Sequence, residues 1–164
     1  MHTQDNREPK AKPFPWFCPR CGKQQVIPDQ VAYTIKVNHD GVLHSVHLPQ
    51  LRVPRCVSCG DLLFEDQADD QISAALRAQL DLLTPEQITQ NRQALGLSRK
   101  ELADRLGVAE KMLAKWEDKF RIQSRSEDNL LRLYFALPDV RRALLGGQNP
   151  QLGASVDLHS TVVG

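Results

Sequence analysis

The sequence predicts an α+β protein of two domains: a small zinc-bound β-ribbon domain at residues 16–66 and an all-α, five-helix helix-turn-helix domain at residues 84–146. Four cysteines, all before residue 60, form two Cys-x-x-Cys pairs, and the residues between the pairs alternate between apolar and polar. From residue 69 onward, apolar residues recur at helical spacing, and capping residues and glycines mark the helix ends. A chain of 164 residues suits one or two small domains.

The cysteine pairs predict a metal site. Two intervening residues allow both thiolates of a pair to bind one ion from a single tight turn, and each pair precedes a glycine that tolerates positive φ. Four thiolates complete a tetrahedral zinc site and leave no position for water, which makes the ion structural. A disulfide pair and a dithiol redox centre are the alternatives for these thiols. The predicted ligands of one Zn²⁺ are Cys18, Cys21, Cys56 and Cys59.

The segment between the cysteine pairs predicts a β-hairpin. Residues 31–37 alternate with period two, and Asp40-Gly41 is typical of a tight hairpin turn. Residues 42–48 form the returning strand, and residues 51–55 lead into the second pair. Trp16 and Phe17 are expected to cover the metal site. The histidines in or beside the hairpin are interpreted as surface residues, because four cysteines already suffice; they are His39, His44 and His47.

Charge marks a boundary between the domains. Residues 60–83 carry one Lys or Arg and six Asp or Glu, whereas residues 1–59 carry eight and four, and residues 84–146 carry twelve and nine. An acidic helix at about 69–82 is therefore predicted within a linker of residues 67–83. Its acidic cluster is interpreted as solvated, because no His or glycine loop supports a second metal site; the cluster comprises Asp66, Asp69 and Asp70. Residues 1–15 are predicted to form a disordered arm, and residues 147–164 a flexible tail.

Five helices are predicted after the linker. Thr84 can cap the first, with Pro85 at its first position and Gln87 completing a capping box. Ser98 and Glu101 form a second capping box. The apolar pattern places Trp116, Tyr134 and Phe135 in the core. The predicted ranges are about 85–94, 99–106, 109–118 and 127–136, followed by a fifth helix that starts after Leu137-Pro138 and ends at Leu145.

The second and third of these helices are joined by a turn of three or four residues. Ala103 is small where the helices cross, and Gly107 permits a sharp turn. This pattern predicts a helix-turn-helix unit, whose second helix can enter the major groove of DNA. An ordinary five-helix bundle with a partner-binding face fits the spacing as well. The block is only mildly basic, so non-specific DNA affinity should be modest and sensitive to salt.

The residues resemble known families. Residues 97–108, with Lys115-Trp116-Glu117, resemble the XRE/Cro-type helix-turn-helix, in which the aromatic residue and the glutamate are structural. The Cys-Pro-x-Cys-Gly pair, the Asp40-Gly41 turn and Leu-x-Val-Pro-x-Cys-x-x-Cys-Gly-Asp at 51–61 resemble the YgiT-type zinc finger. Both halves in this order, over residues 16–145, are similar to the MqsA family of antitoxin-type repressors.

That resemblance implies a sequence-specific repressor that binds double-stranded DNA as a homodimer on a pseudo-palindromic operator. It also implies that the zinc domain binds and neutralises a small toxin. A zinc-stabilised protein-interaction module and a transcription regulator without a toxin are the alternatives. The C-terminal helices are the expected dimer surface, through Leu130, Leu133, Tyr134 and Leu137.

The resemblance also implies which residues contact DNA. Lys111 and Lys115 lie four residues apart and so share one helix face, from which a lysine can donate to guanine. Glu110 could accept from cytosine N4. Each of these residues could instead be a solvated surface charge. The expected phosphate contacts are Arg99 and Lys100 at the start of the preceding helix, and Arg121 and Arg125 after the recognition helix.

Two positions depart from the family pattern. No glycine follows Trp116-Glu117 closely, and Ala109 replaces the usual polar N-cap. The geometry of the loop after residue 117 is therefore open.

Other functional classes find no support in the sequence. No run of about 18 apolar residues predicts a membrane span, and no apolar signal-peptide region opens the chain, so a cytoplasmic location is expected. A reducing compartment favours metal binding over disulfides. No nucleophile elbow, phosphate loop or His-Glu motif occurs, and the protein is not expected to be an enzyme.

Overall fold

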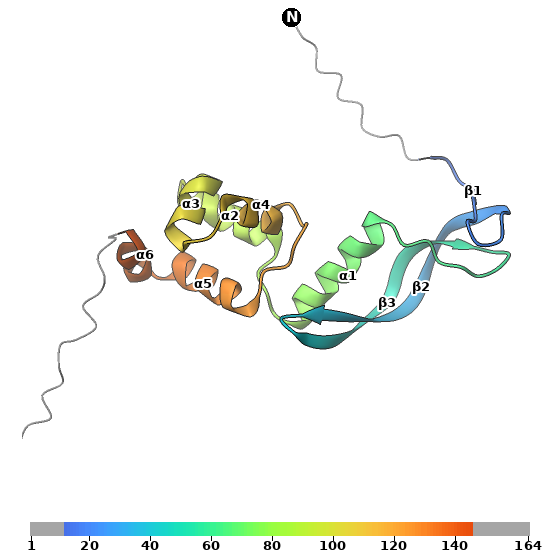
Figure 1. The fold of residues 1–164 in the computed structure, drawn as a ribbon, viewed down its shortest axis with the longest axis horizontal. Coiled ribbons are helices and arrows are strands. Elements are labelled where there is room, and N and C mark those ends of the chain that lie inside the picture. The colour runs from blue at the N-terminus through green and yellow to red at the C-terminus, as the bar shows by residue number, and fades with distance from the viewer. Residues whose placement is uncertain (1–11, 146–164) are drawn as a thin grey trace, which may run out of the picture. The chain divides into compact units, whose positions relative to one another are not determined.

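The computed structural model of the chain describes residues 12–145 (Figure 1). The chain divides after Leu82 into two compact units. The first unit contains a three-stranded antiparallel sheet and one helix, and the second contains five helices. This arrangement confirms the predicted α+β class. No helix within the described range is long and apolar enough to cross a membrane.

The sheet is dominated by one long hairpin. Its strands are β1 (Trp16–Phe17), β2 (Gln24–His39) and β3 (Val42–Cys56), in the order β1-β2-β3. Asp40 and Gly41 have φ values of 53° and 76°, and two positive φ angles are what a tight two-residue hairpin turn requires. The predicted turn is therefore confirmed.

The strands of the hairpin are longer than predicted. Pro28 lies opposite Pro54 in the pairing, and the register shifts between Val31 and Tyr33. Proline cannot donate to a strand ladder, so these positions do not read as strand from the sequence. Pairing nevertheless continues past them to Val26 and Cys56.

The helix α1 (Asp66–Gln79) packs against β3 and belongs to the first unit. Ile72 and Leu76 are buried on this helix. The Gln71 side chain donates to the Arg52 carbonyl at 2.9 Å and accepts from the Arg52 N–H at 3.0 Å, as a neighbouring strand would. The helix starts three residues before the predicted position. The helix was predicted only as a linker between the domains. In the structure it also packs on the hairpin, as part of the first unit.

The second unit contains α2 (Pro85–Ala94), α3 (Arg99–Leu106), α4 (Glu110–Glu117), α5 (Arg125–Ala136) and α6 (Pro138–Leu145). All five predicted helices are present, with ends within two residues of the expected positions. Trp116 and Tyr134 are buried in the core, and Phe135 packs against it. The remaining buried members of this core are Ile88, Leu97, Leu102, Ala103, Leu106, Leu113 and Leu131.

Capping residues set the helix starts. The predicted capping boxes of Thr84 and Ser98 are both present. Ser124 forms a third with Glu127, and this cap moves the start of α5 two residues ahead of the prediction. α1 and α4 lack such a cap, because neither Glu65 nor Ala109 makes a side-chain capping bond.

Two buried polar residues anchor the start of the second unit. Asp128 accepts from the Leu83 N–H at 2.8 Å, and Gln123 donates to the Leu83 carbonyl at 2.7 Å. Arg132 Nε donates to the same Asp128 carboxylate at 2.7 Å. The residue that opens the unit is therefore held on both of its backbone polar groups.

The described residues cover the predicted arm only from Lys12. There the Trp16 indole donates to the Lys12 carbonyl at 2.8 Å, and the Phe14 ring stacks on Trp16 with centroids 4.2 Å apart. The predicted tail, residues 147–164, lies outside the described range.

Candidate metal centre and nucleic-acid interface

The two cysteine pairs form turns of the same geometry. Gly22 N–H donates to the Cys18 carbonyl and Gly60 N–H to the Cys56 carbonyl, both at 2.8 Å. The φ angles of Gly22 and Gly60 are 70° and 77°, a region that glycine occupies at little cost. The sequence prediction for these glycines is confirmed.

The hairpin brings the two turns together. The four cysteine Sγ atoms all lie within 4.8 Å of one another. The separations are 3.6 Å for Cys18–Cys59 and 3.7 Å for Cys21–Cys56. Four sulfurs placed ~2.3 Å from a central zinc ion would be about 3.8 Å apart, so this donor set fits tetrahedral zinc. The separations are too long for a disulfide, whose S–S bond is about 2.05 Å.

The surroundings split the pKa values of two thiols. The backbone N–H of Cys59 is the main cause that lowers the pKa of Cys56 to about 7. The backbone N–H of Asp61 favours the Cys59 thiolate, but desolvation and the thiols of Cys18, Cys56 and Cys21 outweigh it and raise the Cys59 pKa to about 12. A bound cation would stabilise all four thiolates and so offset the desolvation and the neighbouring thiols that raise the Cys59 pKa.

An apolar shell surrounds part of the cluster. Val26 is fully buried beside Cys18 and Cys56, and Trp16 and Leu63 pack against them. Phe17, in contrast, is 68% exposed, so only Trp16 covers the site as predicted. Within residues 12–145 no second group of this kind occurs, and the three predicted acidic residues of the connector are exposed.

The helix-turn-helix lies at α3 and α4. Gly107 ends α3 with a φ of 70°, and the Val108 N–H donates back to the Ala103 carbonyl at 3.0 Å. Ala103 is fully buried where the two helices meet. Leu113 and Trp116 bury one face of α4 in the core. The opposite face of α4 is thereby left to solvent.

Three predicted base-contacting residues lie on α4, all of them exposed: Glu110, Lys111 and Lys115. Neither lysine forms an ion pair with any residue of the described range. Two cations with no internal partner are thus presented by one helix face, four residues apart.

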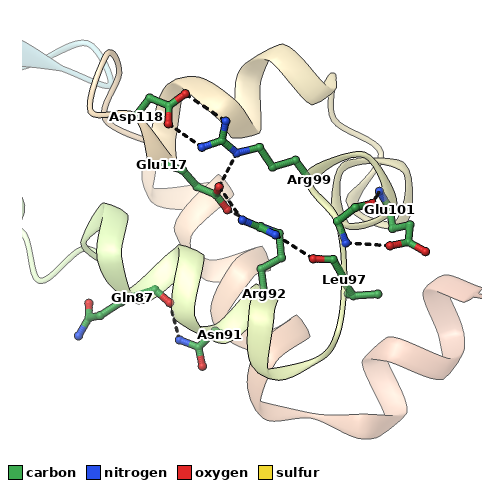
Figure 2. Close-up of polar contacts among 9 residues, drawn as sticks. Gln87, Asn91, Arg92, Leu97, Arg99, Glu101, Glu117 and Asp118 are labelled. Atoms are coloured by element: carbon green, nitrogen blue, oxygen red, sulfur yellow. Dashed lines mark hydrogen bonds and ion pairs between the residues drawn. The ribbon is translucent and has the colours of Figure 1, made fainter. Parts of the chain in front are cut away.

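A buried ion-pair network joins α2, α3 and α4 (Figure 2). The Glu117 side chain has no exposed surface. It accepts from Arg92 Nε at 2.7 Å and Nη2 at 3.0 Å, and from Arg99 Nε at 2.6 Å. Arg99 also binds Asp118 at 2.5 and 3.2 Å, and Arg92 donates to the Leu97 carbonyl at 2.8 Å. The hydrogen bonds of Asp118 and then of Glu117 raise the pKa of Arg99.

The four residues predicted to contact phosphates differ in their exposure and in the ion pairs that they already form. Arg99 is engaged by Glu117 and Asp118, and the exposed Lys100 donates to Asp104 at 2.6 Å, which raises the Lys100 pKa. Arg121 and Arg125 are both exposed. The Arg121 N–H donates to the Lys115 carbonyl at 3.0 Å, so Arg121 lies at the end of α4. Arg125 opens α5, with Nη1 3.9 Å from Asp128.

Lys119 lies in the loop after Glu117, in which the resemblance led us to expect a glycine. Its φ of 68° is in the left-handed region that glycine normally occupies. Lys119 Nζ lies 3.0 Å from Glu86 Oε1. The chain therefore ends α4 at Glu117 and turns through a left-handed lysine, which answers the open question of this loop's geometry.

Sequence reasoning missed Arg92 and Asp118. Arg92 lies four residues after the buried Ile88, so it lies on the core-facing side of α2. A lone arginine on an apolar helix face is a signal that a buried carboxylate lies opposite, although it does not identify which one.

Comparison with known proteins agrees with the geometry of this segment. Residues 88–121 match a family model described as Helix-turn-helix. None of the curated proteins matches the chain. Among solved structures, a crystal structure from Nitrosomonas europaea described as a "Putative DNA Binding Protein" has 13% sequence identity and a TM-score of 0.35, over 67% of this chain and 88% of that one. A likeness at so low a TM-score establishes nothing about the present chain, whereas the family match and the geometry agree that residues 88–121 form a helix-turn-helix.

Proposed function

We propose that this protein is a sequence-specific DNA-binding repressor that places α4 in the major groove. The observation that carries the proposal is the exposed face of α4, where Lys111 and Lys115 have no internal ion-pair partner in a matched helix-turn-helix. Burying two lysines against a protein surface would be costly, whereas DNA supplies guanine acceptors and phosphates for both. No catalytic role is proposed.

The other predicted residues take supporting roles in this proposal. Glu110 accepts from cytosine N4, and Lys100, Arg121 and Arg125 contact phosphates. Arg99 acts chiefly as a positioning residue, because its guanidinium already binds Glu117 and Asp118.

The four cysteines hold one structural Zn²⁺ in this proposal. The sulfur separations suit zinc, and a four-thiolate shell leaves no position for a substrate or water. The ion would stabilise the first unit by joining its two turns.

The double variant Lys111→Ala/Lys115→Ala tests DNA binding. The probe is the DNA directly upstream of the coding sequence, titrated by fluorescence anisotropy at several salt concentrations. We expect affinity to fall by roughly 100-fold, since each good base contact contributes about 1–3 kcal/mol. The control Lys36→Ala/Arg142→Ala removes equal charge from exposed positions outside α4. Equal affinities of the two double variants would overturn the proposal.

A homodimer on a pseudo-palindromic operator completes the proposal, with half-sites about 34 Å apart. Leu133 and Leu137 are 49% and 44% exposed and are available for a dimer surface. Leu130 packs partly into the core, and Tyr134 is fully buried there. Tyr134 is also predicted as a core residue, and because its ring is fully buried, its assignment to the dimer surface is wrong. Sedimentation of Leu133→Glu/Leu137→Glu should show a loss of dimers.

A second candidate role is that the first unit binds and neutralises a small toxin. Phe17 and Val57, at the two cysteine turns, are 68% and 61% exposed and are available to a protein partner. The alternative is a regulator with no toxin. Co-purification with the product of the adjacent reading frame tests the role, and retention by the Phe17→Ser/Val57→Ser variant as well as the parent would count against this surface.

A further inference from the structure

Phe120 is the most exposed large apolar side chain among residues 12–145, with 83% of its surface accessible. It lies three residues beyond Glu117, the last residue of α4, and follows the C-cap Asp118 and Lys119. A phenylalanine ring left in water gains none of the free energy that burial of its apolar surface supplies. Its position beside the proposed recognition helix is therefore notable, because the fold itself makes little use of the ring.

The backbone around Phe120 is held in place. The Arg121 N–H donates to the Lys115 carbonyl at 3.0 Å, which closes the loop onto the end of α4. Lys119 Nζ lies 3.0 Å from Glu86, and Asp118 is bound by Arg99. These bonds hold the backbone of the loop, and so the attachment point of the ring, in place relative to α4.

The charge near Phe120 favours a polyanion as its partner. Glu117 and Asp118 are the nearest carboxylates in sequence, and both are neutralised by arginines. Lys111 and Lys115 on the preceding helix have no ion-pair partner in the described range. An apolar ring beside unpaired cations fits a nucleic-acid backbone, which alternates anionic phosphates with apolar sugar faces.

Resting on the proposed DNA-binding function, we propose that Phe120 packs against a deoxyribose of the strand that borders the major groove when α4 lies in it. The walls of the groove are sugar-phosphate backbones, and a side chain just beyond the end of a groove-bound helix can reach one. Sugar contacts fix position and carry no sequence information directly. Phe120 is in this proposal a positioning residue that adds affinity for any duplex.

The test is Phe120→Ala in the full-length protein, titrated by fluorescence anisotropy from 50 to 200 mM salt. The two probes are the DNA directly upstream of the coding sequence and a shuffled duplex of the same composition. We expect affinity to fall roughly 5- to 20-fold on both probes by the same factor, as burial of part of one aromatic ring would supply. The salt slope should stay unchanged, because no phosphate contact is lost. Phe120→Trp should retain most of the affinity.

Controls separate this inference from the proposed function. Leu43→Ala removes another exposed apolar side chain, from the hairpin of the first unit, and should leave DNA affinity unchanged. Lys115→Ala should weaken binding. If Lys115→Ala weakens binding while Phe120→Ala has no effect, the proposed role of Phe120 is wrong and the proposed DNA binding is supported. If the parent protein binds neither probe, both fall.

Two further results would also overturn the sugar contact. A loss confined to the upstream probe would mean that the ring reads a base edge, such as a thymine methyl. A change in the sedimentation of DNA-free Phe120→Ala would mean that the ring contacts a second copy of the chain.

Discussion

At the scale of single residues, Glu117 connects three helices. Its carboxylate has no exposed surface and accepts three hydrogen bonds from two arginines. Arg92 itself is only 11% exposed in its side chain. A buried guanidinium requires such a partner, because an unpaired buried charge is strongly unfavourable.

We expect Glu117→Leu to destabilise the second unit by about 3–5 kcal/mol, because it leaves the buried Arg92 unpaired. Urea unfolding followed by helical circular dichroism measures this loss. The matched control is Asp104→Asn, which removes an exposed ion pair with Lys100 and should cost less than ~1 kcal/mol. Equal losses for the two variants would show that the network contributes little.

At the scale of elements, three helices of the second unit begin with a side-chain cap, whereas α4 does not. Thr84, Ser98 and Ser124 each accept a backbone N–H at the start of their helices. Ala109 has φ −68° and ψ 138°, close to the backbone angles of the capped positions, but no side-chain oxygen. The proposed recognition helix therefore starts without the bond that stabilises its neighbours.

We expect Ala109→Ser to stabilise the second unit by about 0.5–1 kcal/mol, because the hydroxyl can accept an unpaired N–H in the first turn. The reverse change, Ser98→Ala, should destabilise it by about 1 kcal/mol. Both shifts are measured by urea unfolding with an unchanged m-value. An Ala109→Ser protein no more stable than the parent would contradict the prediction.

At the scale of the whole molecule, two units with separate cores should respond differently to loss of metal. The four cysteines all belong to the first unit, and the core around Trp116 and Tyr134 belongs wholly to the second. Metal binding at a four-thiolate site is coupled to folding of the segment that bears it.

We therefore expect a strong zinc chelator to unfold the first unit and leave the second folded. Circular dichroism should lose its strand contribution and keep most of its helical signal, and Trp116 should stay buried by fluorescence. Cys18→Ser should behave like chelated protein. One cooperative loss of all structure on chelation would contradict this prediction.

Features that depend only on neighbouring residues were predictable from the sequence. The spacing within each cysteine pair, the Asp40-Gly41 turn and the caps at Thr84 and Ser98 depend on residues a few positions apart. Such signals need no knowledge of distant contacts, because the relevant bonds close within one turn. The helix boundaries and the candidate metal ligands follow from them.

Features that depend on residues far apart were decided only by the tertiary structure. The Arg92–Glu117 pair spans 25 positions. Tyr134 is predicted both in the core and on the dimer surface, and only the packing of the unit decides for the core. The hairpin extends past the Pro28–Pro54 pair, although both prolines lack a backbone donor, because the strands pair on both sides of it. Lys119 adopts a left-handed conformation because its flanking residues are bonded to α3 and α4. The sequence by itself determined the elements and the cysteine cluster, whereas only the folded chain decided which charges are used internally and which remain for a partner, since charge pairing depends on distance in space.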